Sequence, residues 1–301
     1  MFQPLDLPVL GLGVSLSLGE KPSPLSLYEN MQHSPQPQFV EYAGLCDVNL
    51  LQSQLQPLQD AKIPLLFHPS FINFCGSLKN HSEWLNTAQE HMQAIQSPWF
   101  AQDCAYCFFS DNQGYSSQFA YFIPPILNSA SLAQSVMRIH EVKAHIQAPV
   151  LIEPPPVTFV IGRMSVFDYF SQLSIEADCG LLLDMGHLVS YQLATGTSVL
   201  DDLHLLPVER VIELHIAGGR LINSDNPVYV DAHEEDVLDE TWQMFDALLP
   251  HLPNIKAVCF ECEGVAEEKV FSTLAIIKEK ILTLSVNPEL VDKVSFSGKA
   301  S

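Results

Sequence analysis

Strand-like apolar runs alternate with helix-like segments along most of the chain, and this alternation is the strongest constraint on its fold. Short runs rich in Val, Ile, Leu and Phe predict eight strands, at Val9–Leu18, Gln38–Tyr42, Pro64–His68, Phe100–Phe109, Val150–Glu153, Gly180–Asp184, Arg210–Ile216 and Ala257–Glu261. The clearest helix between them runs up to Ile146, with Ser131 as its expected N-cap. Strict alternation favours a closed (β/α)₈ TIM barrel, and an open doubly wound sheet is the alternative if one strand is miscounted.

The chain is long enough for one such barrel, at 301 residues. We expect residues 1–286 to form a single metal-binding domain and the polar segment 287–301 to be a flexible tail. No run approaches the roughly 18 consecutive apolar residues of a membrane-spanning helix. The apolar start of the chain also lacks the basic residues of a signal peptide. We therefore expect no membrane partner.

Charge and cysteine content narrow the partners and the compartment. The formal net charge is −21, from 35 acidic and 14 basic residues, so a nucleic acid backbone would be repelled. The seven cysteines are an odd number, which favours a reducing compartment, here the cytoplasm. Cys104–Cys107 and Cys259–Cys262 have CxxC spacing, but both pairs lie in strand-like runs. Because residues three apart on a strand point to opposite faces, we do not expect a structural zinc site there.

Imidazoles and carboxylates stand at or just after the ends of five predicted strands. In a barrel, the C-terminal ends of the strands and the loops after them form the active face. Eight side chains are therefore expected to converge there: His68, Glu153, Asp184, His187, His215, Asp231, His233 and Glu261. Taken singly, each has a simpler explanation, since a strand-end histidine is often only hydrogen-bonded and Glu261 is also placed to cap the next helix. Their coincidence on one face favours a metal centre.

The donor types indicate which metals would fit. Four crowded carboxylates repel one another, so cations are needed to keep them together. Mixed imidazole and carboxylate ligation suits zinc, iron or manganese better than calcium or copper(I). The lack of thiolates among the best-placed groups favours iron or manganese, and eight groups exceed the needs of one ion. We expect two or three ions.

Six motifs link the chain to a known family. They are FVEYAGLC, LLFHPSFINF, LLLDMGHLV, LPVERVIELHIAGG, VDAHEEDVLDETW and VCFECEG, in that order within residues 10–280. With them the chain resembles the multinuclear non-heme iron-dependent oxidative enzymes (MNIO), a family that includes the iron oxidase of methanobactin biosynthesis. The resemblance implies a TIM barrel with two or three irons of mixed Fe²⁺/Fe³⁺ state. It also implies dioxygen as co-substrate for oxidising a cysteine, or another residue, of a ribosomally synthesised precursor peptide (RiPP biosynthesis), often with a leader-binding partner protein.

Carried over to this chain, the resemblance implies the same eight residues as metal ligands, with Glu153 bridging two irons. The chain departs from the family pattern in two places. The fourth strand usually carries a histidine in a Ser-Asp/Glu-His context, and here it reads Gln102-Asp103-Cys104, so Cys104 is the candidate ligand in its place. Pro154 follows Glu153 where the family usually has Asn. These departures leave open a two-iron enzyme, a changed substrate, or a relative that has lost activity.

Two other functions fit the same residues. A divalent-metal hydrolase or isomerase on this barrel would use the ions to activate water without redox chemistry. A non-catalytic relative would bind a peptide or partner protein at the barrel mouth. The motifs favour the first hypothesis, an iron oxidase that modifies a precursor peptide.

Overall fold

Eight parallel strands form a closed barrel in the order β1-β12-β9-β8-β7-β4-β3-β2. The computed structural model describes residues 2–17, 22–30, 33–43, 55–110, 116–223, 225–233 and 236–296. The barrel strands are β1 (Gly11–Ser17), β2 (Val40–Ala43), β3 (Leu65–Phe67), β4 (Phe100–Asp103), β7 (Val150–Glu153), β8 (Gly180–Asp184), β9 (Val211–Ala217) and β12 (Ala257–Glu261). The predicted (β/α)₈ barrel is confirmed.

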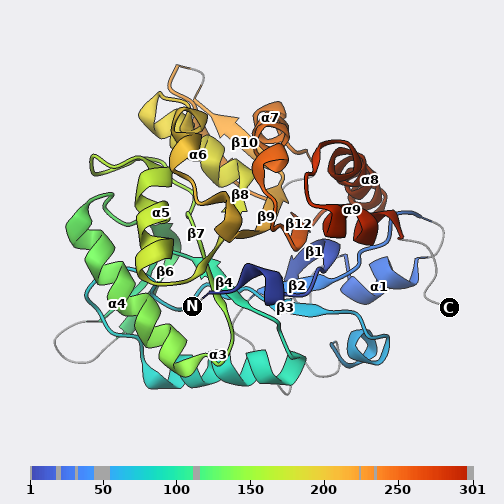
Figure 1. The fold of residues 1–301 in the computed structure, drawn as a ribbon, viewed down its shortest axis with the longest axis horizontal. Helices are drawn as coiled ribbons and strands as arrows, with labels where there is room; N and C mark the ends of the chain where they lie inside the picture. The colour runs from blue at the N-terminus through green and yellow to red at the C-terminus, as the bar shows by residue number, and fades with distance from the viewer. Residues whose placement is uncertain are drawn as a thin grey trace.

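Helices surround the barrel and bury their apolar faces against its strands (Figure 1). They are α1 (Pro24–Glu29), α3 (Ser82–Ile95), α4 (Ser129–His145), α5 (Val166–Glu176), α6 (Met185–Thr195), α7 (Asp239–Leu248), α8 (Glu267–Leu284) and α9 (Pro288–Ser295). The N-cap of α4 is Asn128 and not the expected Ser131, because the extended backbone of Asn128 lets its side chain accept a hydrogen bond from the Ser131 N–H.

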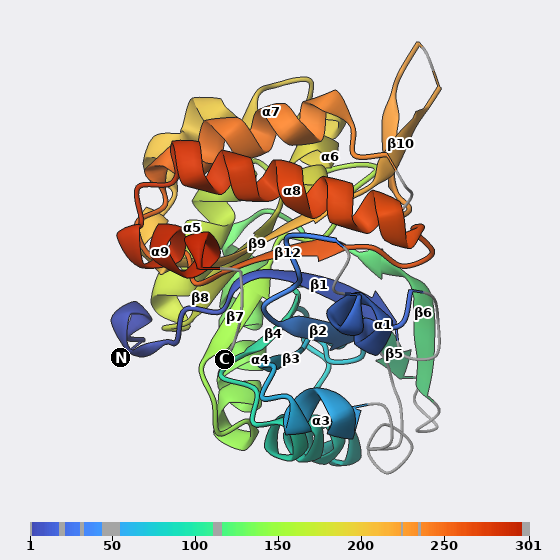
Figure 2. The same ribbon diagram turned by 90° about the vertical axis from the view of Figure 1, so that its right-hand side faces the viewer.

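Two hairpins interrupt the simple alternation of strands and helices. The fourth predicted strand, Phe100–Phe109, is in fact two strands, because the chain turns at Cys104–Ala105 and leaves the barrel. β5 (Tyr106–Ser110) then pairs antiparallel with β6 (Ser116–Ile123), and β10 (Gly219–Ile222) pairs with β11 (Val228–Asp231) in the same way. Both hairpins project from the end of the barrel opposite the N-terminus (Figure 2). They build walls around the C-terminal ends of the strands.

Part of the segment expected to be a flexible tail is an ordered helix. α9 is capped by Asn287, whose side chain accepts hydrogen bonds from the Glu289 and Leu290 N–H groups. Leu290 and Val294 are buried against the barrel, and Asn287 Nδ2 donates to the Ile255 carbonyl over 2.7 Å. The cap, the proline at the first helical position and an apolar i, i+4 pair explain this order. Residues 297–301 of the expected tail lie outside the described residues.

The barrel interior holds its own apolar cluster below the C-terminal ends of the strands. It contains Leu7, Leu10, Phe39, Leu66, Trp99, Ala101, Leu151, Leu182, Ile212, Ala257 and Cys259. Because residues two apart on a strand share a face, a side chain two positions further along points into the barrel above this cluster. Those positions are occupied by polar residues in six strands or strand ends: Glu41, His68, Asp103, Glu153, Asp184 and Glu261. The fold thus places acids and imidazoles over an apolar floor.

Candidate metal centre

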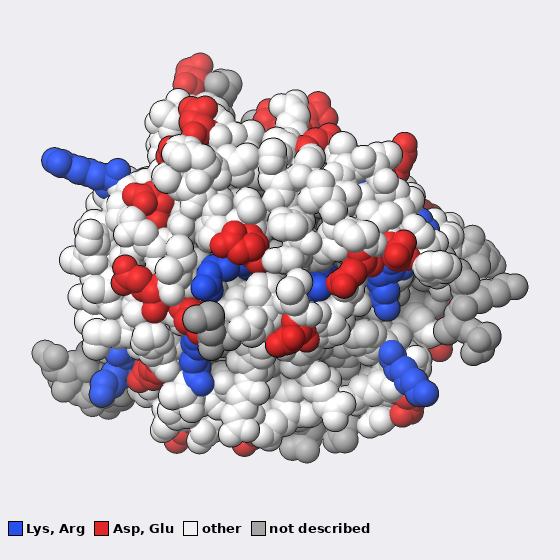
Figure 3. All heavy atoms as spheres, viewed as in Figure 1, with Lys and Arg blue, Asp and Glu red and all other residues white. Residues whose placement is uncertain are grey.

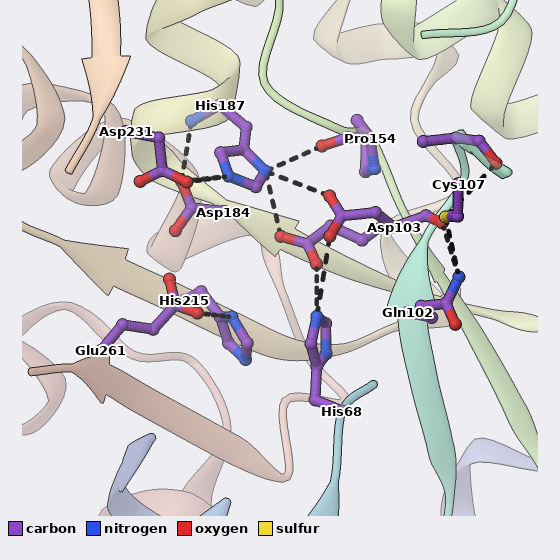
Figure 4. A network of polar contacts seen from close by, with 12 residues as sticks. His68, Gln102, Asp103, Cys107, Pro154, Asp184, His187, His215, Asp231 and Glu261 are labelled. Atoms are coloured by element: carbon purple, nitrogen blue, oxygen red, sulfur yellow. Dashed lines mark hydrogen bonds and ion pairs between the residues drawn. The ribbon is translucent and has the colours of Figure 1, made fainter. Parts of the chain in front are cut away.

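Figure 4 shows the polar cluster, with the labelled side chains of His68, Asp103, Asp184, His187, His215, Asp231 and Glu261 gathered in one place. Glu153 lies between His68 and His187 in this cluster. It is 1% exposed, and its two oxygens face two different imidazoles. Oε1 is 3.1 Å from His187 Nδ1, and Oε2 is 3.4 Å from His68 Nε2. Asp103, its neighbour on β4, adds an oxygen 3.8 Å from His68 Nε2. One carboxylate therefore stands between two sets of donor atoms.

The first turn of α6 positions two further candidate ligands, Asp184 and His187. Asp184 ends β8 and caps α6, with Oδ1 accepting a 2.7 Å hydrogen bond from the His187 N–H. One turn into the helix, His187 Nδ1 lies 3.0 Å from the Pro154 carbonyl, and Nε2 lies 3.2 Å from Asp231 Oδ2. A nitrogen that donates to a carbonyl fixes the tautomer and leaves the other nitrogen as a ligand. The main-chain carbonyl of Pro154 thus orients the ring of His187.

The third side of the cluster joins β9, β12 and the loop after β11. His215 Nδ1 is 3.4 Å from Glu261 Oε1. His233 Nε2 is 3.5 Å from both Asp231 Oδ1 and Glu261 Oε2. On its other side, His233 Nδ1 is 2.7 Å from Glu263 Oε2. All eight residues predicted at the strand ends therefore lie in one cluster.

The donor atoms fall into four overlapping sets that suit cations. In each set the ligand atoms lie within 4.8 Å of one another, and the sets are Glu41/His68/His215, His68/Asp103/Glu153, Glu153/Asp184/His187 and Asp184/His215/Glu261. Several buried atoms in them have no hydrogen-bond partner, including both oxygens of Glu153 and Oδ2 of Asp184. Buried polar atoms without partners cost folding free energy unless an ion or water pairs with them. The residues present therefore fit bound metal.

The sequence prediction did not include four carboxylates of this cluster: Glu41, Asp103, Glu213 and Glu263. Asp103 is the last residue of β4 and pairs in register with Glu153, but the overlong predicted strand hid this end. Glu41 and Glu213 lie deeper and contact His215 Nε2 at 3.2 and 3.8 Å. Glu263 follows Glu261 by two residues. An acidic residue inside an apolar run was the available signal for Glu41 and Glu213.

Cys104 does not lie with the candidate ligands. It is fully buried in the outer apolar core between strands and helices, with Sγ 3.7 Å from the Phe74 carbonyl. Over the described ranges, none of the four donor sets contains a cysteine. Neighbouring strand residues point to opposite faces, so when Asp103 faces the cluster Cys104 faces away. Asp103, and not Cys104, therefore lies among the candidate ligands at the end of β4.

Burial and crowding shift the pKa values of the cluster. Burial lowers the pKa of His68, but the charges of Glu41 and Glu153 and a hydrogen bond with Asp103 outweigh it and raise it to about 9. Burial and the charge of Asp103 raise the pKa of Glu153 to about 8. For Glu261, burial acts upward, but His233 and His215 hold the pKa at about 2. Protons and imidazolium groups thus balance the carboxylates when no metal is bound.

Metal affinity is expected to rise steeply with pH because metal must displace these protons. Between pH 6 and 8, His68 and Glu153 both carry a proton, given their pKa values of about 9 and about 8. For an ion held by His68 and Glu153, displacing these two protons makes the apparent affinity rise by about a hundredfold per pH unit between pH 6 and 8. Chelator competition at pH 6, 7, 8 and 9 measures this slope. An affinity that is constant from pH 6 to 8 would contradict the assignment of these two residues as ligands.

Two glycines allow the β10–β11 hairpin to lie close against α6. A Cβ at Gly186 would overlap the Tyr229 hydroxyl, and a Cβ at Gly219 would lie 2.5 Å from the same atom. Gly186 precedes His187, and Tyr229 is two residues before Asp231 on β11. The contact therefore sets the distance between the two candidate ligands His187 and Asp231.

Gly186→Ala is expected to lower the free energy of unfolding by about 1–3 kcal/mol, the usual cost of overpacking. Urea unfolding of the metal-free protein measures this loss. Combining it with Tyr229→Phe, which removes the nearest overlapping atom, is expected to recover part of the loss. Equal stability of Gly186→Ala and the wild-type protein would show that the hairpin does not lie against this glycine.

The cluster opens into a cavity of about 350 Å³ at the mouth of the barrel. Its lining consists of Ser15, His68, Ser70, Asp103, Phe122, Glu153, His187, Asp231, Ala232, His233, Glu261 and Glu263. The lining contains no Lys or Arg among the described residues. A substrate side chain can thus reach the donor atoms, and metal would be the main positive charge it meets.

Comparison with known proteins decides the family. A family model described as RiPP precursor modification enzyme MbnB/TglH/ChrH matches residues 25–269, which is most of the chain. The chain belongs to this family. The suspected family is therefore confirmed.

Individual relatives match over shorter stretches. A UPF0276 protein of Rhizobium meliloti is 31% identical over 131 residues, 42% of each chain, and one of Alcanivorax borkumensis is 32% identical over 115 residues, 36% of this chain and 38% of that one. The matches thus span less than half the length of these relatives. A UPF0276 protein of Shewanella sediminis is 22% identical over 70% of this chain and 69% of its own.

Solved structures support the fold. A xylose isomerase-like TIM barrel protein from Mycobacterium smegmatis in complex with magnesium superposes with a TM-score of 0.56 at 10% identity, covering 94% of this chain and 99% of that one. D-psicose 3-epimerase in the presence of D-fructose gives the same TM-score and identity, covering 91% and 99%. At this identity the likeness shows the barrel alone.

Surface properties bear on the remaining partners. In the face shown in Figure 3, basic and acidic side chains are scattered, and basic ones form no continuous patch among the described residues. The expectation that nucleic acid is not a partner stays a prediction. Among the described residues, the helices are too short or too polar to cross a bilayer.

Proposed function

We propose that this enzyme is an iron- and dioxygen-dependent oxidase that modifies a residue, in the first place a cysteine, of a ribosomally synthesised precursor peptide. The observation that carries the proposal is Glu153, whose two buried oxygens face the separate imidazoles of His68 and His187. A carboxylate in that position suits a bridge between two cations. Family membership supports a peptide substrate.

The donor set supports iron over softer metals. The candidate ligands are imidazoles and carboxylates only, and the described cysteines are buried outside the four donor sets. His68, Asp103 and Glu153 would hold one ion, and Asp184, His187 and Asp231, with Glu153 shared, would hold a second. His215, Glu261 and His233 would hold a third. When bound, iron supplies the redox chemistry with dioxygen that the side chains lack.

The protein's own groups hold and orient these ligands and exclude water. The Pro154 carbonyl fixes the ring of His187, and Glu263 does the same for His233 from the rim. Asp184 is held by the first turn of α6, so its second oxygen faces the cluster. The apolar floor of the barrel closes the site from below. Side chains held in this way lose little entropy when metal binds.

A peptide substrate suits the surface beside the cavity. An apolar hollow of about 550 Å³ is lined by Ser77, Leu78, Tyr106, Phe108, Ile123, Pro124, Pro125, Ile126, Phe159 and Ile161. It adjoins the metal cavity, because Phe122 lines the cavity and the next residue lines the hollow. We expect the peptide to place its reacting residue in the cavity and apolar neighbours in the hollow. A separate protein that presents the peptide's leader belongs to this proposal.

The test is a change in peptide mass. The protein is loaded with ferrous iron without oxygen and then mixed in air with precursor peptides encoded beside its gene. The proposal predicts an oxidative mass change at one residue that requires both iron and dioxygen. An unchanged peptide, or equal activity with zinc in the absence of oxygen, would argue against it, and the latter result would favour a hydrolase or isomerase.

A further inference from the structure

We propose that Glu41 is a positioning residue that orients the imidazoles of His68 and His215 from behind the metal centre. The proposal rests on the metal centre described above and concerns a carboxylate outside the ligand set that the family resemblance implies. Glu41 lies on β2, and its side chain is fully buried. It does not line the cavity that a substrate would enter.

Glu41 is placed between the two histidine rings. Its Oε1 is 3.2 Å from His215 Nε2, and its ligand atoms lie within 4.8 Å of those of His68 and His215. The centroids of the two rings are 5.2 Å apart. Neither oxygen of Glu41 accepts a main-chain hydrogen bond among the described residues. The two imidazoles are thus the donors available to this carboxylate.

In each of the two histidine rings, one nitrogen faces the metal centre and the other faces away from it. His215 directs Nδ1 toward Glu261, at 3.4 Å, and Nε2 toward Glu41. His68 directs Nε2 toward Glu153, and its buried Nδ1 has no hydrogen-bond partner. A neutral imidazole binds metal through one nitrogen and donates a proton from the other. Glu41 is the acceptor for those second N–H groups.

The surroundings of Glu41 favour this role over a further metal ion. An ion between Glu41 and His215 would need both nitrogens of His215 as ligands and so a doubly deprotonated ring. Behind the pair, Glu213 lies 3.8 Å from the same Nε2 and accepts a 2.7 Å hydrogen bond from Trp99 Nε1. Trp99 belongs to the apolar cluster of the barrel interior. The acids therefore link the centre to a rigid floor.

The experiment compares Glu41→Gln with Tyr42→Phe. Tyr42 is the next residue on β2, and its hydroxyl bonds to His91 away from the centre, so its variant controls for loss of a buried polar group from this strand. Ferrous iron affinity and stoichiometry are measured anaerobically by chelator competition, and cobalt(II) absorption spectra report the geometry of the ligands. Urea unfolding verifies that each variant is folded.

Glu41→Gln is expected to bind as many ions as the wild type, with an affinity about 10- to 100-fold lower and an altered cobalt spectrum. Tyr42→Phe should match the wild type in both. Glu41→Asp keeps the charge on a shorter side chain, and its metal affinity should lie between those of Glu41→Gln and the wild type. It replaces Glu41→Gln in the test if the glutamine variant does not fold. Loss of one whole ion would make Glu41 a ligand and overturn the proposal, as would unchanged affinity. If the wild type itself binds no metal, both the proposed function and the proposal about Glu41 fail.

Discussion

Replacing Glu153 by Gln is expected to remove at least one metal ion per chain and to lower the affinity for the remaining ions by more than about a hundredfold. Loss of partners outside the ligand set costs about 10- to 100-fold in affinity, and loss of a shared ligand should cost more. Both oxygens of this buried carboxylate face imidazoles of different donor sets. Turnover of the peptide should fall below detection, because the two sets lose their common member.

Glu153→Gln should also change how the stability of the metal-free protein depends on pH. Burial and Asp103 raise the pKa of Glu153 to about 8 in the folded, metal-free protein, above its ordinary 4.5. A group with a raised folded pKa loses its contribution to stability as the pH rises from the unfolded value through the folded one. Metal-free wild type should therefore lose stability between about pH 4.5 and 8, and the glutamine variant should be spared this loss.

Urea unfolding of both metal-free proteins at pH 5, 7 and 9 measures that difference. Glu141→Gln is the matched control, because it neutralises a carboxylate paired with Arg138 on α4. It should leave metal content unchanged. A Glu153→Gln protein that keeps its full complement of metal would show that this carboxylate is not a ligand.

Asp103 and Cys104 are adjacent, but their substitutions are expected to affect different properties. Replacing Asp103 should lower metal affinity, and replacing Cys104 should lower stability. Asp103→Asn should lower the affinity of the His68 donor set for metal by at least about tenfold, because a charged ligand is lost. Cys104→Ser should leave metal content unchanged and lower the free energy of unfolding by about 1–3 kcal/mol, because a hydroxyl enters an apolar core. Elemental analysis and urea unfolding measure the two effects.

Cys104→His extends this test, because the family pattern places a histidine there. In this structure the position faces the outer core, so a histidine should destabilise the fold without adding iron. A gain in bound iron, together with an Asp103→Asn protein that binds normally, would show that β4 presents its other face to the centre.

The sequence was sufficient to predict the barrel and the candidate ligands at its strand ends. Three predicted strands match β7, β8 and β12 residue for residue, and they end in Glu153, Asp184 and Glu261. Their apolar runs stop where the interior changes from an apolar cluster to the polar cluster, so the composition itself marks the strand end. The candidate site was predictable because each of these strands ends at the level where the apolar cluster gives way to the polar one.

The same reasoning failed where an apolar run continues beyond the barrel. β4 ends at Asp103, but Tyr106–Ser110 continues the strand-like pattern in a separate hairpin. Hydrophobic periodicity reports burial and not the sheet to which a strand belongs, so it concealed Asp103. Cys104 became the candidate because it stands where the family pattern has a histidine. Glu41 was missed for a different reason. Its partner His215 is distant in sequence, and only the closed barrel brings the two together.

The most direct test of the metal centre is a count of bound iron in the wild-type protein. The protein is loaded anaerobically with ferrous iron, passed through a desalting column, and analysed by elemental analysis and Mössbauer spectroscopy. We expect two or three irons per chain in nitrogen and oxygen ligation, at least one of them ferrous. A folded protein that retains less than one iron per chain would contradict the account.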